Sequence, residues 1–488
     1  HDRHPTVAAL AEAYPEAKWI TGGGTRVLPA EGSGITMVPV SLTPPAPWPN
    51  ALTEAWTVET WLDPAREPAL RIYTLGADDV STLRPAGPGT DFAHVVRVHD
   101  VSPCQEGRVG ESCAVRITWE PIAHYPSLQP ILRLFHPETG EWDRTMPFHY
   151  PSEMWTPGEI VIDQLTATPP PGMPPGDGYR IALGFYDPER QQALPKLDGE
   201  QFGGLEMHVP ARAFAPAAPE QWSRACAGLP ERQTSITKNL HLDGWQLNAD
   251  TVPQGGTVPL TLCWQATVNS PSGKKVHLRI HGPALETLYA GPPAGGYTFD
   301  RWRDGERVED RYRLSLPKTL PGGIYTLTLA VDARATVDLG AVTVTPIERT
   351  FTAPDPDHPL DVTFGGKLQL LGYDRDPLNP GQPWVLTLYW KVLQALNRDY
   401  RVFVHLRDAQ TGEVVAQTDV TPGQGAYPTH LWMGGEIVTD PLTLSVPQNL
   451  QSGTYAVDIG LYVPTTGDYL DVQGARSLTL IQNIKAEP

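Results

Sequence analysis

The 488-residue sequence has no apolar run that approaches the roughly 18 residues needed to cross a bilayer. Basic residues are outnumbered, with 37 Lys and Arg against 55 Asp and Glu, so the formal charge is −18. That charge repels nucleic-acid phosphates and anionic headgroups, and we expect neither nucleic acid nor a membrane surface as a partner. The chain begins at His1 without a basic and apolar leader, which predicts a mature or excised product.

Cysteines are also few, with only four in the sequence. None forms a C-x-x-C pair or a zinc-like array with histidines, so a structural metal is not expected. Cys104 and Cys113 flank a short loop, whereas Cys226 lies in a Pro/Ala-rich connector and Cys263 in a strong strand. We predict the disulfides Cys104–Cys113 and Cys226–Cys263, and therefore an extracytoplasmic location. Buried free thiols in a cytosolic protein are the alternative.

The motifs of common catalytic sites are missing as well. The sequence contains no G-x-S-x-G elbow, no P-loop and no dinucleotide fingerprint followed by a βα unit. We therefore predict no catalytic residue, no cofactor and no metal. Two alternatives remain open: a calcium loop around Asp355, Asp357 and Asp361, and a zinc pair formed by His277 and His281 on one strand face.

Turn-forming residues are abundant, with 45 glycines and 52 prolines. Hydrophobic residues still make up 40 % of the chain, which is enough for folded cores. Short alternating apolar stretches separated by Gly, Pro and Asp are typical of antiparallel strands joined by turns. The composition therefore favours an all-β architecture.

A threefold internal repeat is the main signal. Its first landmark is a glycine that stands nine residues before a tryptophan, with every second residue in between largely apolar: Gly110 and Trp119, Gly255 and Trp264, Gly381 and Trp390. A period of two means that one face of a strand is buried. We predict that these three tryptophans lie in equivalent cores.

The second landmark is another tryptophan, followed by a Gly-Glu turn. The residues are Trp155 with Glu159, Trp302 with Glu306, and Trp432 with Glu436. A tyrosine then opens a further strand: Tyr179, Tyr325 and Tyr455. The second tryptophan could cover one end of a sandwich or stack on a sugar ring, so we name Trp155, Trp302 and Trp432 as candidate ligand-binding residues. We expect the glutamates to accept hydrogen bonds from turn amides or the indole.

These patterns predict a mainly β protein with three tandem immunoglobulin-like antiparallel β-sandwich domains, preceded by a small α/β segment. The expected boundaries are 1–90 for the segment and 91–212, 233–348 and 360–488 for the sandwiches. Pro/Ala-rich connectors join them and are expected to be semi-extended. Within the first segment we predict helices over Thr6–Tyr14 and Asn50–Trp61, and strands over Lys18–Ile20, Thr25–Leu28, Ile35–Val38 and Ala69–Leu75.

The third copy resembles a known module. The residues that carry the resemblance are Leu370–Tyr373, Leu388–Trp390, Val402–Leu406, Tyr427–Thr429, Trp432–Glu436 and Gly453–Tyr455. The module is the C-terminal extracytoplasmic β-sandwich of bacterial multi-spanning membrane glycosyltransferases, similar to the dolichyl-phosphate-mannose-protein mannosyltransferase and aminoarabinose transferase group. In that family the catalytic acids lie between membrane helices that this sequence lacks, so no catalytic residue carries over. The resemblance implies an accessory ectodomain.

We therefore expect a non-catalytic extracytoplasmic scaffold or recognition module for a glycan or a cell-surface protein. The alternatives are an accessory ectodomain that assists acceptor binding by a glycosyltransferase, and a subunit of a surface layer or filament. A secreted carbohydrate-active enzyme is a further alternative.

Overall fold

The structure is a computed structural model that describes residues 25–32, 34–39, 57–62, 68–103, 107–145, 150–189, 192–199, 201–267, 273–332, 336–464 and 466–486. The protein is mainly β, and nearly all of its strand pairs are antiparallel. Three large hydrophobic core clusters each lie between two sheets. We call these sheet pairs sandwich 1, sandwich 2 and sandwich 3. The chain forms two compact units, His1–Ala225 and Cys226–Pro488.

Sandwich 1 encloses a core that runs from Phe92 to Ala217. Its first sheet has the order β1 (Arg26–Leu28), β11 (Ile160–Ala167), β8 (Cys113–Pro121), β6 (Val96–Ser102) and β5 (Thr90–Phe92). Its second sheet has the order β10 (Gly140–Thr145), β9 (Gln129–His136), β12 (Arg180–Asp187) and β13 (Gln192–Ala193), and β16 (Met207–Pro210) also pairs with β12. Short pairs join β14 (Leu197–Asp198) to β15 (Gln201–Phe202) and β17 (Phe214–Ala215) to β7 (Gly107–Arg108).

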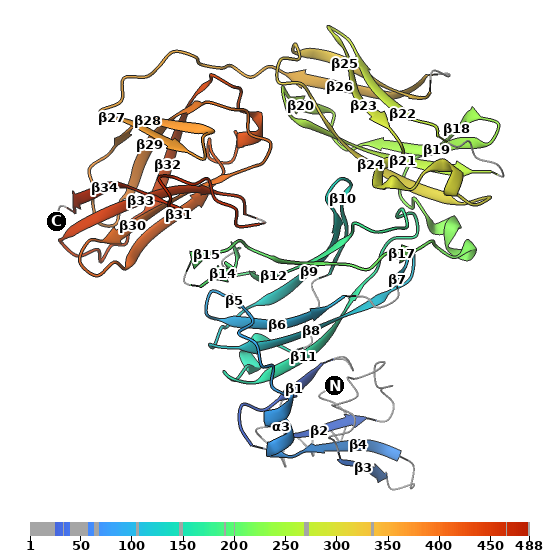
Figure 1. The fold of residues 1–488 in the computed structure, drawn as a ribbon, viewed down its shortest axis with the longest axis horizontal. Helices are drawn as coiled ribbons and strands as arrows, with labels where there is room; N and C mark the ends of the chain where they lie inside the picture. Colours follow the sequence, from blue (N-terminus) through green and yellow to red (C-terminus); the bar gives the residue numbers. More distant parts are fainter. Residues whose placement is uncertain are drawn as a thin grey trace. The chain divides into compact units, whose positions relative to one another are not determined.

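Sandwich 2 has a four-stranded and a five-stranded sheet (Figure 1). The first has the order β18 (Glu231–Thr237), β19 (Leu240–Leu247), β21 (Thr257–Ala266) and β24 (Arg307–Ser315). The second has the order β20 (Thr251–Pro253), β26 (Val337–Thr345), β25 (Gly323–Val331), β22 (Val276–His281) and β23 (Leu285–Gly291).

Sandwich 3 has two four-stranded sheets, which are drawn one above the other in Figure 1. One has the order β27 (His358–Phe364), β28 (Leu368–Arg375), β29 (Pro383–Val392) and β32 (Ile437–Ser445). The other has the order β31 (Val414–Val420), β30 (Arg401–Asp408), β33 (Thr454–Tyr462) and β34 (Leu478–Lys485). Short 3-10 turns precede or join the strands: η1 (Ser152–Met154), η2 (Pro219–Arg224), η3 (Ala294–Gly296), η4 (Phe299–Arg301) and η5 (Thr429–Leu431).

The three predicted core tryptophans occupy equivalent positions. Trp119, Trp264 and Trp390 are 6 %, 0 % and 0 % exposed, and each lies on the central strand of its sheet. Each is paired across one side with a valine, namely Val161, Val308 and Val438. On the other side each is followed by a bulge in the neighbouring strand, after Val98, Leu242 and Leu370. The prediction of equivalent buried indoles is confirmed.

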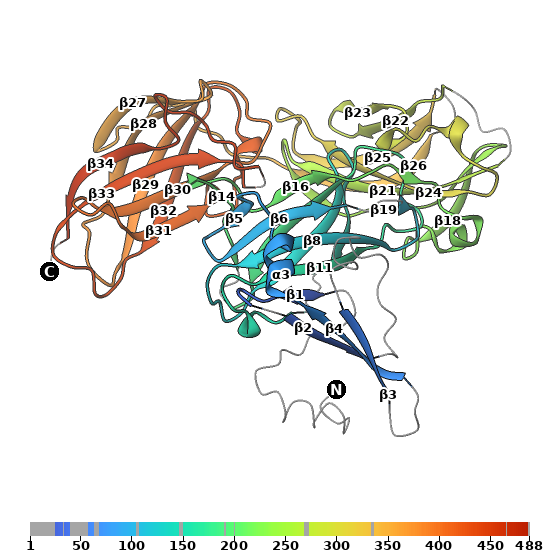
Figure 2. The same cartoon turned by 60° about the horizontal axis from the view of Figure 1, so that its bottom comes forward.

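The N-terminal segment contains a three-stranded sheet and one helix among its described residues. The sheet has the order β2 (Gly34–Pro39), β4 (Pro68–Leu75) and β3 (Thr57–Leu62), and the helix is α3 (Ala77–Leu83). Val80 of α3 packs with Leu28 of β1 and Ile160 of β11, and α3 lies beside β1 in Figures 1 and 2. The small cluster attaches this segment to sandwich 1.

The helix predicted over Asn50–Trp61 is wrong where the structure describes it. Residues Thr57–Leu62 form strand β3, which pairs with β4 through Val58 and Tyr73 and through Trp61 and Leu70. Three of its six residues, Thr57, Val58 and Thr60, are β-branched and favour a strand over a helix. Residues 50–56 and the predicted elements Thr6–Tyr14 and Lys18–Ile20 lie outside the described residues, and α3 was not predicted.

One predicted disulfide is present. Cys226 and Cys263 are bonded, with their Cα atoms 5.9 Å apart, and the bond ties a connector residue to the central strand β21. The other predicted pairing involves Cys104, which lies outside the described residues and stays a prediction.

We expect Cys226→Ser to lower the free energy of unfolding of sandwich 2 by about 3–4 kcal/mol, because the bond closes a 37-residue loop in the unfolded chain. Hydrogen exchange of peptides from residues 231–345 in the full chain measures this. Ser223→Ala, an exposed change in the same connector, is the control. Equal protection in both variants would contradict the expectation.

Candidate functional site

The three candidate ligand-binding tryptophans are buried in the structure. Trp155, Trp302 and Trp432 are 1 %, 7 % and 0 % exposed. Two of them pack edge-on against core rings: Trp155 lies 4.8 Å from Trp119, and Trp302 lies 4.7 Å from Phe299 between ring centroids. A sugar ring needs an open aromatic face, so these indoles are not stacking platforms. The structure thus corrects this prediction in favour of the covering role.

A tyrosine five residues before each of these tryptophans completes the turn. The sets are Tyr150, Trp155 and Glu159; Tyr297, Trp302 and Glu306; and Tyr427, Trp432 and Glu436. Each indole Nε1–H donates to the main-chain oxygen of its tyrosine, at 3.1, 3.0 and 3.0 Å. Each tyrosine hydroxyl donates to the carboxylate of its glutamate, at 2.7, 3.1 and 2.6 Å. We call each set a Tyr-Trp-Glu turn.

The glutamate also fastens the main chain of the turn. The backbone N–H that follows each tryptophan, in Thr156, Arg303 and Met433, donates to the glutamate Oε2 at 3.0, 2.8 and 2.8 Å. The glycine before each glutamate has a positive φ of 88°, 78° and 84°, a region that favours glycine. The N–H of this glycine donates to the main-chain oxygen of the residue two positions after the core tryptophan, which is Pro121, Ala266 or Val392. The prediction that turn amides donate to these glutamates is confirmed.

The protonation of the three tyrosines and the burial of the three glutamates indicate that these turns are structural. Burial and the adjacent carboxylate raise the pKa of Tyr150, Tyr297 and Tyr427 well above the ordinary value, so the phenols stay protonated as donors. The three glutamates are 6 %, 2 % and 2 % exposed. The repeated tyrosines and glutamates are therefore engaged with each other inside the turns.

The third turn binds an additional cation. Arg349, from the connector before sandwich 3, donates through one nitrogen to the Glu436 carboxylate at 2.5 Å, to Tyr427 at 2.7 Å and to the Leu431 main chain at 2.9 Å. The side chains of Arg349 and Glu436 are 7 % and 2 % exposed. Lys318 donates to the main-chain oxygen of Trp432. The third turn is thus a buried ion-pair site as well as a cap.

Three buried aspartates recur that the sequence analysis missed. Asp163, Asp310 and Asp440 each stand four residues after the turn glutamate and are 4 %, 0 % and 0 % exposed. Each has the same register, opposite Ile117, Leu262 and Leu388. Asp310 accepts the Trp264 indole N–H at 3.1 Å, and Asp163 accepts the Thr25 hydroxyl at 2.7 Å. The constant Glu-x-x-x-Asp spacing could have revealed them.

Asp440 is the least well satisfied of these aspartates. Its Oδ1 accepts the Gly423 N–H at 2.8 Å, whereas Oδ2 makes no hydrogen bond of normal geometry with the described residues, although the Trp390 indole is close enough to oppose the shift in the pKa of Asp440. Burial in the core raises the pKa of Asp440 to about 6. Because the folded chain holds this proton more tightly than the unfolded chain does, the ionised carboxylate destabilises sandwich 3 at neutral pH.

We expect this cost to be on the order of 3 kcal/mol above pH 6 and to disappear on acidification below pH 4. Asp440→Asn should therefore be more stable than the parent chain at pH 7 and equally stable at pH 4. Urea unfolding at the two pH values, compared between parent and variant, measures the difference. A difference that is the same at both pH values would contradict it.

The two metal alternatives find no support in the geometry. His281 is an exposed residue at the end of β22, and its Nε2 lies 2.9 Å from the hydroxyl oxygen of Thr328. Asp361 accepts a bond from Gln369 at 2.6 Å. In the part of the chain that the structure describes, no group of three or more His, Cys, Asp or Glu side chains could hold a metal ion. Nor does any described helix have the length and apolar character to span a membrane.

The fold and the repeated turn define a mainly β, sandwich-like protein with internally bonded Tyr-Trp-Glu turns. No protein family matches the chain, and no curated protein matches it either.

Proposed function

We propose that this chain is a non-catalytic, extracytoplasmic scaffold that presents recognition surfaces for a glycan or a protein partner. The observation that carries the proposal is that the tyrosine and glutamate side chains of all three Tyr-Trp-Glu turns are bonded within their own turn. A catalytic group must reach a substrate, and these buried groups do not. The feature that recurs in all three copies is a buried turn that covers one end of the sandwich.

The extracytoplasmic location is part of the same proposal. It is supported by the Cys226–Cys263 disulfide, since such bonds persist in oxidising compartments. The charge of −18 suits a partner that is neutral or basic. Because the second tryptophans are buried, recognition falls to exposed loops and outer sheet faces.

A glycan array that also measures the mass of each glycan tests this proposal. The full chain is expected to be retained on a neutral glycan class, and no glycan should change in mass. A chain-dependent mass change would overturn the non-catalytic assignment, and the absence of retention would overturn glycan recognition. Trp302→Phe is the control, because it keeps the buried ring and should bind like the parent.

The second candidate is an accessory ectodomain of a membrane glycosyltransferase. It is supported by the motif series of the third copy, from Leu370–Tyr373 to Gly453–Tyr455, which resembles the C-terminal sandwich of those enzymes. Retention on the acceptor glycans of such an enzyme, and on no others in the array, would favour this candidate over a general scaffold.

A further inference from the structure

The connector after sandwich 1 stays packed on that sandwich almost to its end. Ala217 is buried in the sandwich 1 core, and Trp222 packs against the same core from η2. Between them, the Gln221 side chain closely approaches Gly110, where a Cβ atom would lie 3.3 Å from it. The chain is therefore fixed to sandwich 1 as far as Trp222.

The next fixed residue is Cys226, which belongs to sandwich 2. Its disulfide partner Cys263 lies on β21, paired with Gly244 on one side and Glu309 on the other, and is 1 % exposed. Only Ser223, Arg224 and Ala225 separate the two anchors. The boundary between the two compact units falls at this place, between Ala225 and Cys226.

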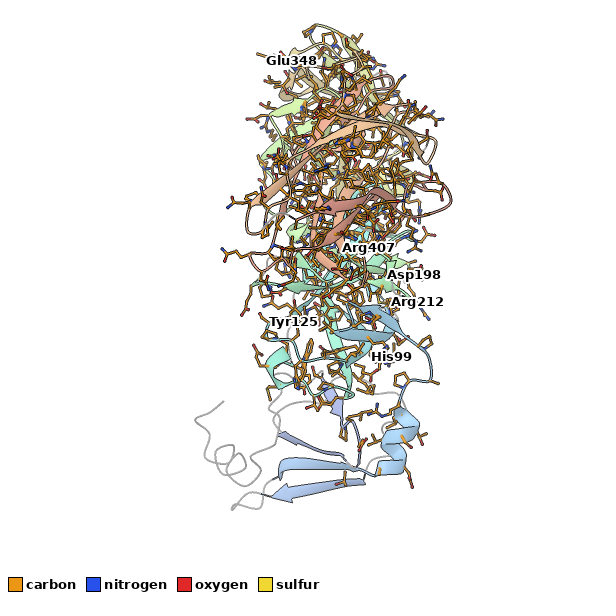
Figure 3. The ribbon with its side chains drawn as sticks, turned by 90° about the vertical axis from the view of Figure 1, so that its left-hand side faces the viewer. His99, Tyr125, Asp198, Arg212, Glu348 and Arg407 are labelled. Atoms are coloured by element: carbon orange, nitrogen blue, oxygen red, sulfur yellow. A yellow bond between two sulfur atoms is a disulfide. The ribbon has the colours of Figure 1, made fainter. Side chains whose placement is uncertain are left out.

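The second connector is anchored in the same manner. The Ile347 N–H donates to the Gln254 side chain of sandwich 2 at 2.9 Å, and Gln254 in turn donates to the Leu320 main chain at 2.6 Å. Arg349 is held by Glu436 of sandwich 3. Glu348, labelled in Figure 3, is the one residue between these anchors.

Sandwich 3 holds this connector a second time through its main chain. The Ile437 N–H donates to the Thr350 oxygen at 2.7 Å, next to Arg349. If the Arg349 side-chain contacts were lost, the unanchored part of this connector would therefore grow only from Glu348 to Glu348 and Arg349. The connector between sandwiches 2 and 3 therefore stays anchored to sandwich 3 when the ion pair is removed. The connector between sandwiches 1 and 2 is anchored to sandwich 2 through the disulfide of Cys226.

We propose that the connectors are short joints pinned on both sides, and that the Cys226–Cys263 disulfide sets the reach between the two compact units. With the bond intact, Trp222 and Cys226 are at most about 14 Å apart. Without it, the next fixed residue is Glu231 at the start of β18, and the limit rises to about 31 Å. The bond thus acts on reach as well as on stability.

Solution X-ray scattering of the full chain tests the proposal. Cys226→Ser should widen the distance distribution and lengthen the maximum dimension by up to about 17 Å. Arg349→Met is the matched control: it removes a buried anchor and destabilises sandwich 3, but it should leave the scattering unchanged because Thr350 stays paired. Both variants are expected to destabilise a sandwich, so if lost stability were the cause of the expansion, both would change the scattering.

A second variant keeps the test valid if Cys226→Ser unfolds sandwich 2. Five Gly and Ser residues inserted between Arg224 and Ala225, with the disulfide intact, should reproduce the wider distribution. An insertion that leaves the scattering unchanged would overturn the proposal, since reach would then not depend on joint length. Expansion by the insertion but not by a folded Cys226→Ser chain would show that the disulfide is not the pin.

Discussion

Glu436→Ala is expected to destabilise sandwich 3 by about 3–5 kcal/mol, because it leaves the Arg349 guanidinium buried without its counter-ion. The same change removes the acceptor for the Tyr427 hydroxyl and the Met433 N–H. Hydrogen exchange of peptides from residues 358–486 in the full chain measures the loss. Peptides from sandwich 1 should keep the protection they have in the parent chain.

Two further variants separate the ion pair from the turn. Glu306→Ala removes the equivalent carboxylate in sandwich 2, where the nearest cationic side chain is Arg303, a partly exposed residue of the same turn, and should cost less. Arg349→Met combined with Glu436→Ala removes both charges and should recover part of the loss. If the double variant is less stable than Glu436→Ala, the unpaired Arg349 is not the main cause.

The second large effect is expected at the core tryptophan of sandwich 3. Trp390→Ala should lower the free energy of unfolding of this sandwich by about 3–5 kcal/mol, since it empties a fully buried indole site. The site is lined in part by Phe364, whose ring centroid lies 5.3 Å from the indole. Thermal unfolding of the full chain, followed by calorimetry, should show one transition moved to lower temperature.

Phe351→Ala is the matched control for that substitution. Phe351 is also aromatic but is 57 % exposed, so its removal should change stability by no more than about 0.5 kcal/mol. The repeat predicts that Trp119→Ala and Trp264→Ala each affect a different sandwich. A single transition shifted equally by all three variants would contradict independent cores.

Period-two spacing made the strands and the three core tryptophans predictable. In β29, the buried residues Trp384, Leu386, Leu388 and Trp390 alternate with less buried ones, and such a pattern is local to the sequence. The Glu436 interaction with a turn amide was likewise predictable, because both groups lie within one short turn. These features needed no knowledge of distant contacts.

The position of the second tryptophan was not predictable in that way. Trp432 sits between irregular residues, so no period tells whether its ring points inward. Its burial depends on Tyr427 and on the packing of η5, which appear only in three dimensions. The cation at Glu436 comes from Arg349, 87 residues earlier, and no spacing within the repeat points to it.

The sequence alone determined that this protein is mainly β and that its landmarks recur three times. Local periodicity and turn chemistry carry those properties. Tertiary structure decided that the second tryptophans are covers, that Cys226 is the partner of Cys263, that Asp440 is buried in the core of sandwich 3 and that both connectors are pinned. Those outcomes depend on which distant groups are brought together after the sheets close, since burial and ion pairing are properties of the assembled core.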